Sequence, residues 1–145
     1  MIVPMFGRDP EFSRLSNLAL DRIISLKEID KDFIKNTEYD FSEYFEDIIG
    51  VSKSHEDLPV IIHLLFTPEQ APYILTKPIH GSQKKLRNDS EGLLISIEVI
   101  PNRELFSLLL SFGERVKVVS PEIIQRRIIE VYQKALLGYS PGEEL

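Results

Sequence analysis

The chain of 145 residues contains no cysteine and no tryptophan. The lack of cysteine excludes disulfides, thiolate metal sites and cysteine nucleophiles. No apolar run approaches the roughly 20 residues that are needed to span a bilayer. The apolar start, Met1 to Gly7, lacks the basic region and the small-residue cleavage site of a signal peptide. We therefore expect a cytoplasmic protein that does not bind membranes.

Motifs of catalysis are missing as well. No two of the seven glycines are close enough to form the GxGxxG motif of a phosphate-binding loop, and neither HExxH nor GxSxG occurs. The three histidines do not have the spacing of metal ligands, and His63, within an apolar run, is interpreted as a core or edge histidine with an internal partner. The sequence predicts a protein that is not an enzyme and that carries no metal or cofactor.

Negative charge is present but unevenly distributed. Residues 1–58 hold seven basic and thirteen acidic residues, a net charge of −6, whereas residues 59–145 hold ten of each. An acidic chain is unsuited to binding nucleic acid regardless of sequence, which needs clustered positive charge. One local exception is the segment 77–87, which holds four Lys/Arg residues and His80 but no acidic residue. A binding surface for an anion is expected to begin there.

The first third of the chain reads as strands followed by a helix. Apolar residues alternate with polar ones between Leu15 and Glu28, which predicts a half-buried strand with a bend near Asp21, preceded by a strand within residues 1–6. Asp40 and Glu43 have the spacing of a capping box, so a connector helix of about nine residues is expected to follow and to end at Gly50. The polar residues 53–58 are predicted to be the linker between residues 1–52 and a domain of residues 59–145.

The second part has a clear order of elements. Pro59 to Phe66 is an apolar run that predicts a buried strand, and Thr67-Pro68 predicts the N-cap and first residue of a short helix. The later elements are expected as strands over 79–87, 93–100 and 116–119, a helix over 102–112, and a last helix from Ser120-Pro121 to Gly138. The order β-α-β-β-α-β with a final helix predicts an α+β, ferredoxin-like (split-βαβ) domain.

The segment from His80 to Lys85 is the best candidate for a binding site. Lysines supply positive charge, and serine and glutamine supply directed hydrogen bonds, so Ser82, Gln83 and Lys84 suit contact with an anion or a nucleotide. The alternative is an exposed edge strand whose lysines only prevent edge-to-edge pairing. The residue types leave both interpretations open.

The same segment carries a resemblance to a known family. Phe66-Thr67-Pro68-Glu69-Gln70-Ala71-Pro72-Tyr73, then Pro78-Ile79-His80-Gly81-Ser82-Gln83, resembles the C-terminal extension of WYL-domain transcriptional regulators, as does the stretch from Leu109 to Pro121. The similarity covers about residues 59–139 in the right order. The stretch from Asn17 to Ile23 resembles a strand near the end of a WYL domain, a small Sm-like barrel, and residues 39–51 resemble the connector between the two domains.

The resemblance implies a role in regulation. It implies that residues 1–52 are a partial barrel remnant with a connector helix, and that the chain is a fragment beginning after the Trp-Tyr-Leu signature. Arg22 matches the second arginine of the family's basic site, while Ser16 stands at the first. It also implies that duplex DNA is bound only by a helix-turn-helix domain that this chain lacks.

Two hypotheses follow for this bacterial type of regulator. The first is an effector-sensing and dimerising region that binds single-stranded nucleic acid or a nucleotide through Arg22, His80, Ser82, Gln83 and Lys84. The second is a protein–protein oligomerisation module with no ligand, in which segment 77–87 serves only solubility or contacts an acidic patch of a partner. Arg22 has an alternative of its own, an ion pair with Asp21 or with a carboxylate of the acidic connector. In both hypotheses, the chain is expected to form a homodimer, and residues 1–29 are expected to pair with the extension's sheet or with a second copy.

Overall fold

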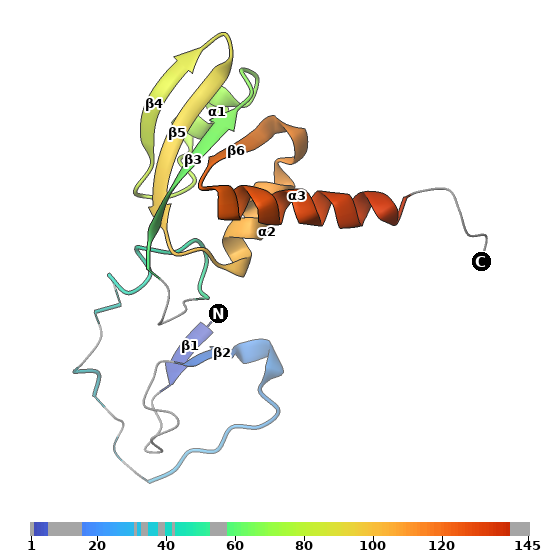
Figure 1. Cartoon of the computed structure of the whole chain (residues 1–145). Helices are drawn as coiled ribbons and strands as arrows, with labels where there is room; N and C mark the ends of the chain where they lie inside the picture. Colours follow the sequence, from blue (N-terminus) through green and yellow to red (C-terminus); the bar gives the residue numbers. More distant parts are fainter. Residues whose placement is uncertain are drawn as a thin grey trace. The chain divides into compact units, whose positions relative to one another are not determined.

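The computed structural model describes residues 2–5, 16–30, 32, 35–37, 40–41, 43–52 and 58–139 (Figure 1). These fall into two compact units, Met1–Tyr44 and Phe45–Leu145. Most of the predicted linker, residues 53–57, lies outside the described residues. Within the described part of the chain, no helix is long and apolar enough to cross a membrane.

The N-terminal unit contains a hairpin. Strand β1 (Ile2–Met5) pairs antiparallel with β2 (Ser16–Ala19), and the 3-10 helix η2 (Leu20–Arg22) follows. The predicted early strand and the bend near Asp21 are therefore confirmed. The predicted strand is wrong beyond Ala19, because residues 23–30 have no regular structure. The described residues of this unit do not show the predicted barrel remnant.

Solvent exposure explains why the alternation failed to produce a longer strand. Ile24 and Leu26 are 101% and 83% exposed, so neither contributes buried apolar surface. A strand needs a hydrogen-bonded neighbour and a covered face, and a lone two-stranded hairpin is only marginally stable in water. Beyond Ala19, the described residues provide neither, so the chain leaves the extended pairing.

The C-terminal unit has the predicted βαββαβα order. Its strands and helices are β3 (Val60–Phe66), α1 (Ala71–Thr76), β4 (Lys84–Asp89), β5 (Gly92–Val99), α2 (Arg103–Ser111), η3 (Gly113–Arg115), β6 (Val116–Ser120) and α3 (Glu122–Leu137). Helix α1 begins later than predicted. The amides of Gln70 and Ala71 both donate to the Thr67 carbonyl, which forms a turn ahead of the helix.

The four strands form one antiparallel sheet in the order β4-β5-β3-β6 (Figure 1). Each β-α-β crossover leaves one strand of the other between its own two, which is the split-βαβ arrangement that the sequence predicted. The hairpin between β4 and β5 turns at Ser90 and Glu91. Gly92 has φ of +124°, and a Cβ there would lie 2.0 Å from the Phe66 carbonyl oxygen, so only glycine fits.

The core lies between one face of the sheet and the helices. Its buried residues come alternately from the strands and from one stripe of each helix. They are Ile62, Leu64, Phe66, Ala71, Ile74, Leu93, Ile95, Ile97, Val99, Leu105, Leu109, Val118 and Ile124. Because β3 buries every second residue, the side chains between them face away from the core.

Residues 45–52 are bonded to this domain by Asn102. Its side-chain oxygen accepts from the Leu105 amide at 2.8 Å and so caps α2 at the predicted start of this helix. Its side-chain nitrogen donates to the carbonyls of Ile49 and Ser52 at 2.8 and 2.9 Å. One side chain thus caps a helix and holds the connector.

The predicted connector helix is wrong for the described residues, which form turns over 43–47. The amide of Ile100 donates to the Asp47 carbonyl at 2.7 Å. Together with the two carbonyls bound by Asn102, this bond attaches the end of the connector to the domain. A helix ending at Gly50 would have left these carbonyls without internal partners, so they were available to the domain in either conformation. Gly50 has the predicted positive φ, +82°.

Glu104 completes this attachment. The Ser52 hydroxyl donates to Glu104 Oε1 at 2.6 Å, while Oε2 is buried and has no partner within hydrogen-bond distance among the described residues. Burial opposes ionisation of Glu104, but the Ser52 hydroxyl and the nearby amides of Glu104, Val51 and Ser52 outweigh it and lower the pKa.

Candidate functional site

The face of the sheet that points away from the core is the candidate site. Residues directly opposite each other on paired antiparallel strands share a face. The register therefore places two rows across all four strands on this outer face. The first row is Lys84, Ser96, His63 and Ser120, and the second is Arg87, Leu94, Leu65 and Lys117. With strands about 4.8 Å apart, each row extends over about 14 Å.

This outer face combines apolar and polar groups. Ile61 and Val119 are 56% and 45% exposed, and Leu65 and Leu94 are half-buried. Ser96 is buried between its neighbours. The face therefore offers both apolar contact area and hydrogen-bonding groups to a ligand.

His63 lies at the centre of the face. Its Nδ1 is 2.7 Å from the Ser120 hydroxyl oxygen, and the ring is half-buried. The expectation of an internal partner is confirmed, but the expected location is wrong, because His63 lies on the outer face of a central strand and not in the core or at an edge. The contact holds the ring in a defined orientation on a central strand, where its second nitrogen remains able to donate or accept.

Positive charge lies at both edges of the face. Lys84 on β4 and Lys117 on β6 are exposed, and neither forms an ion pair among the described residues. The acidic residues of this face lie at its ends, Glu98 opposite Ile61 and Asp89 opposite Gly92. Lys84 and Lys117 are the cations of the two rows that no carboxylate pairs among the described residues.

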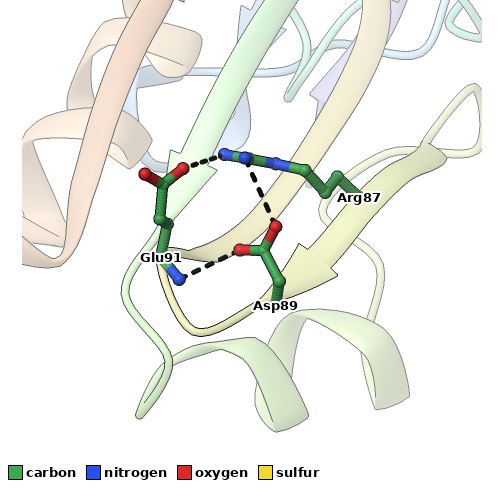
Figure 2. Close-up of polar contacts among 3 residues, drawn as sticks. All are labelled: Arg87, Asp89 and Glu91. Atoms are coloured by element: carbon green, nitrogen blue, oxygen red, sulfur yellow. Dashed lines mark hydrogen bonds and ion pairs between the residues drawn. The ribbon is translucent and has the colours of Figure 1, made fainter.

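Arg87 has a different environment. Its guanidinium contacts Asp89 Oδ2 at 3.3 Å and Glu91 Oε2 at 2.7 Å, and the Glu91 amide donates to Asp89 Oδ1 at 2.9 Å (Figure 2). These bonds brace the β4–β5 hairpin. Because two carboxylates neutralise Arg87, the basic segment 77–87 offers less free charge than its composition predicts.

Edge strand β4 has features that discourage aggregation. It pairs only with β5 in the described sheet, and all its residues are exposed. A bulge falls at Leu86, between the Lys85–Ile95 and Arg87–Leu94 pairs. Lysines and a bulge on an edge strand are typical protection against strand addition. The interpretation of β4 as a protected edge strand therefore fits the structure. It does not require that every lysine of β4 has only this protective role.

The predicted site residues Ser82 and His80 form a turn ahead of β4. The Ser82 hydroxyl oxygen accepts from the Glu98 amide at 2.8 Å and lies 3.1 Å from the Glu98 carbonyl, so it extends the β4–β5 pairing by a side chain. Both the amide and the hydroxyl of Ser82 also lie within reach of His80 Nδ1. The predicted start of this strand, at Ile79, is wrong because side chains take over the pairing here.

Gln83 also bonds within the domain. Its side-chain nitrogen donates to the Ile74 carbonyl at 3.1 Å, and its oxygen accepts from the Ile79 amide at 3.0 Å. This tethers the end of α1 to the turn. The side chains of Ser82 and Gln83 are therefore largely occupied, and Lys84 is the predicted residue that best retains free binding capacity.

A cavity of about 570 Å³ lies beside this turn. It is lined by Phe45, Glu46, Ile48, His80, Gly81 and Ser82. The charged residue in this lining is a glutamate, which is unfavourable for an anion. The cavity therefore fits the predicted ligand less well than the outer sheet face does.

The structure brings the predicted residues together only in part. His80, Ser82, Gln83 and Lys84 are consecutive or nearly so in the C-terminal unit, whereas Arg22 belongs to the N-terminal unit. Arg22 is exposed on η2 and has no ion pair among the described residues. The roles assigned to all five residues stay predictions.

Sequence reasoning missed the residues that join Lys84 on the outer face. Ser96, Ser120 and Lys117 come from three separate stretches, and only the strand register brings them beside His63. The one available signal was a histidine at an outward position of an apolar strand. No group of three potential metal ligands occurs within the described ranges.

Comparison with known proteins supports a regulatory origin. No curated protein matches the chain. A family model, the WCX domain, matches residues 58–136, which is more than half of the chain and includes all four strands of the larger sheet. WCX domains are the C-terminal extensions of WYL-type transcriptional regulators, a family that is not catalytic. The chain therefore belongs to the WCX domain family.

Proposed function

We propose that the chain is the effector-sensing region of a WYL-type transcriptional regulator and that the outer sheet face binds a single-stranded nucleic acid or a nucleotide. The observation that carries this proposal is the placement of Lys84 and Lys117 at opposite edges of a face centred on His63. Lysines suit phosphate oxygens, and the half-buried apolar residues suit base surfaces.

The arrangement of charge on the outer face suits such a ligand. The two lysines at the edges can contact phosphates, while Leu65 and Leu94 between them can contact sugar and base surfaces. The absence of aromatic side chains on the two rows limits stacking, so the expected affinity depends mainly on charge.

The test uses two neighbouring lysines on β4. Lys84 lies on the outer face opposite Ser96, while Lys85 lies opposite the buried Ile95 and therefore on the other face. Titration of the chain with a fluorescent oligothymidylate, followed by anisotropy, should show binding that weakens with salt. Lys84→Ala should weaken it several-fold and reduce the salt dependence by about one charge.

Lys85→Ala is the control, since it removes the same charge from the same strand. It should change the affinity much less than Lys84→Ala does. His63→Ala should weaken binding without changing the salt dependence. If the two lysine variants behave alike, or the oligonucleotide does not bind at low salt, the outer face is not the binding site.

We also propose a second role, self-association, on a separate observation. Helix α3 continues past the sheet toward the C-terminus (Figure 1). Its first turns pack Ile124 and Ile128 against the core, whereas Leu136 and Leu137 farther along are 70% and 73% exposed. A helix end with apolar residues on several sides favours a partner.

Light scattering after size exclusion tests this role. A homodimer through α3 should dissociate when Leu136→Glu and Leu137→Glu are combined. Gln133→Glu, an exposed polar position on the same helix, is the control for added charge. A wild-type chain that remains monomeric at high concentration would contradict the role, while leaving nucleotide binding to be judged by its own test.

A further inference from the structure

The domain has a second surface of interest, a mostly apolar groove between α2 and α3. Its volume is about 900 Å³, which lies within the range of small-molecule sites. Most of the lining is apolar. The apolar part of the lining includes Val60, Phe106, Leu110, Ile123 and Val131.

The charged residues of this lining are both arginines. Arg103 begins α2 and Arg127 lies in the second turn of α3, and neither forms an ion pair among the described residues. No aspartate or glutamate belongs to the lining. An apolar groove whose only formal charges are positive is complementary to a molecule with an apolar body and one anionic group.

Arg127 is also held in place. Its guanidinium carbon lies 5.1 Å from the centre of the Phe106 ring. Stacking on an aromatic face orients the guanidinium while leaving its in-plane donors free. The adjacent Arg126 differs, because Glu122 bonds and neutralises it. The two neighbouring arginines are therefore not equivalent, and only one is available to a ligand in the groove.

We propose that the α2–α3 groove binds a small amphipathic anion, such as a carboxylate with an aliphatic chain. The chain lies along Phe106 and Leu110, and the carboxylate bonds to the guanidinium of Arg127 with Arg103 nearby. This site is separate from the outer sheet face, and it neither requires nor supports nucleotide binding there.

Octanoate is the probe, and octan-1-ol, which has the same chain length without the charge, is its control. Both are titrated into the whole chain while amide NMR spectra are recorded. Octanoate should produce saturable shifts that concentrate on the lining residues of α2 and α3. Octan-1-ol should bind the same place more weakly, because it cannot form the charge-assisted bond.

Arg127→Gln should weaken octanoate binding by about tenfold, the size of one charged hydrogen bond in a half-open site. It should leave octan-1-ol binding nearly unchanged. Arg126→Gln should alter neither, although it removes the same charge from the neighbouring position. The dispersion of the NMR spectra shows whether each variant keeps its fold.

Three results would overturn the proposal. The first is octanoate shifts that scatter over the surface or do not saturate. The second is equal affinity for octanoate and octan-1-ol. The third is an equal loss of binding in Arg126→Gln and Arg127→Gln, which would indicate general attraction to a positive surface. None of these results bears on the oligonucleotide test, because Lys84 lies outside this groove.

Discussion

The two units of the chain use a similar sequence pattern with different results. In the N-terminal unit, Ile24 and Leu26 alternate with polar residues yet stay exposed. In the C-terminal unit, Ile62 and Leu64 occupy alternate positions of β3 and are fully buried. The difference is the layer of helices, which covers one face of the larger sheet. Alternation specifies a strand only where a second layer can bury the apolar side.

The largest effect is expected where that layer is complete. Leu64→Ala should lower the free energy of unfolding by about 2–5 kcal/mol, because it leaves a cavity among close-packed side chains. Denaturant unfolding measures this loss. Leu65→Ala on the same strand faces outward and should cost clearly less. Equal losses at the two positions would show that both faces of β3 are covered.

A smaller loss is expected at the attachment of the connector. Asn102→Ala removes the cap of α2 and both bonds to the carbonyls of Ile49 and Ser52. We expect a loss of about 1–3 kcal/mol in unfolding free energy. Asn88→Ala, at an exposed position of β4, is the control and should have little effect. If both variants were equally stable, the connector would not be bound in solution.

Glu104 provides a pH-dependent version of the same test. Its folded pKa is lowered below the ordinary 4.5. Its ionised form therefore stabilises the fold above that pH, and this contribution is lost as the pH falls through the folded pKa. Glu104→Gln should cost under about 1 kcal/mol at neutral pH.

The gap in stability between Glu104→Gln and wild type should narrow as the pH falls below 4.5. Thermal or denaturant unfolding at several pH values measures it. Glu114→Gln changes an exposed carboxylate on η3 and serves as the comparison. A gap for Glu104→Gln that stays constant with pH would contradict the proposed role of its charge.

The smallest effect is expected in the N-terminal unit. Leu26→Ala should change the unfolding free energy by less than about 0.5 kcal/mol, since the side chain is already exposed. Calorimetry of the whole chain measures it. A loss comparable with that of Leu64→Ala would mean that Leu26 is buried in solution, for instance against a second copy of the chain. The two units would then no longer differ in the burial of their alternating apolar residues.

Local signals predicted the elements of the C-terminal domain well. Asn102 and the glycines at 92 and 113 mark ends that depend on a few neighbouring atoms, and the structure has its cap and turns there. Thr67-Pro68 misplaced the start of α1, whose N-cap is Gln70. The connector helix was predicted from local spacing, but residues 43–47 form turns and the segment is bonded to the Asn102 side chain and the Ile100 amide. A pattern of local spacing carries no information about such bonds to distant residues.

The candidate sites show the same division. Lys84 was predicted from a run of residues with free hydrogen-bonding groups, but Ser82 and Gln83 in that run form bonds within the domain. Conversely, no local signal marked Lys117 and Ser120 as residues of a site. They share a face with His63 only because β6 pairs with β3 in one register.

The sequence by itself determined the order of elements, the family resemblance and the contrast in charge between the two parts of the chain. These follow from composition, short-range spacing and turn residues, which are local properties. Only the tertiary structure decided which apolar residues are buried, which lysines are free and which polar residues meet on the outer sheet face. Those outcomes depend on strand register and on helix packing, which bring together residues that are far apart in the chain.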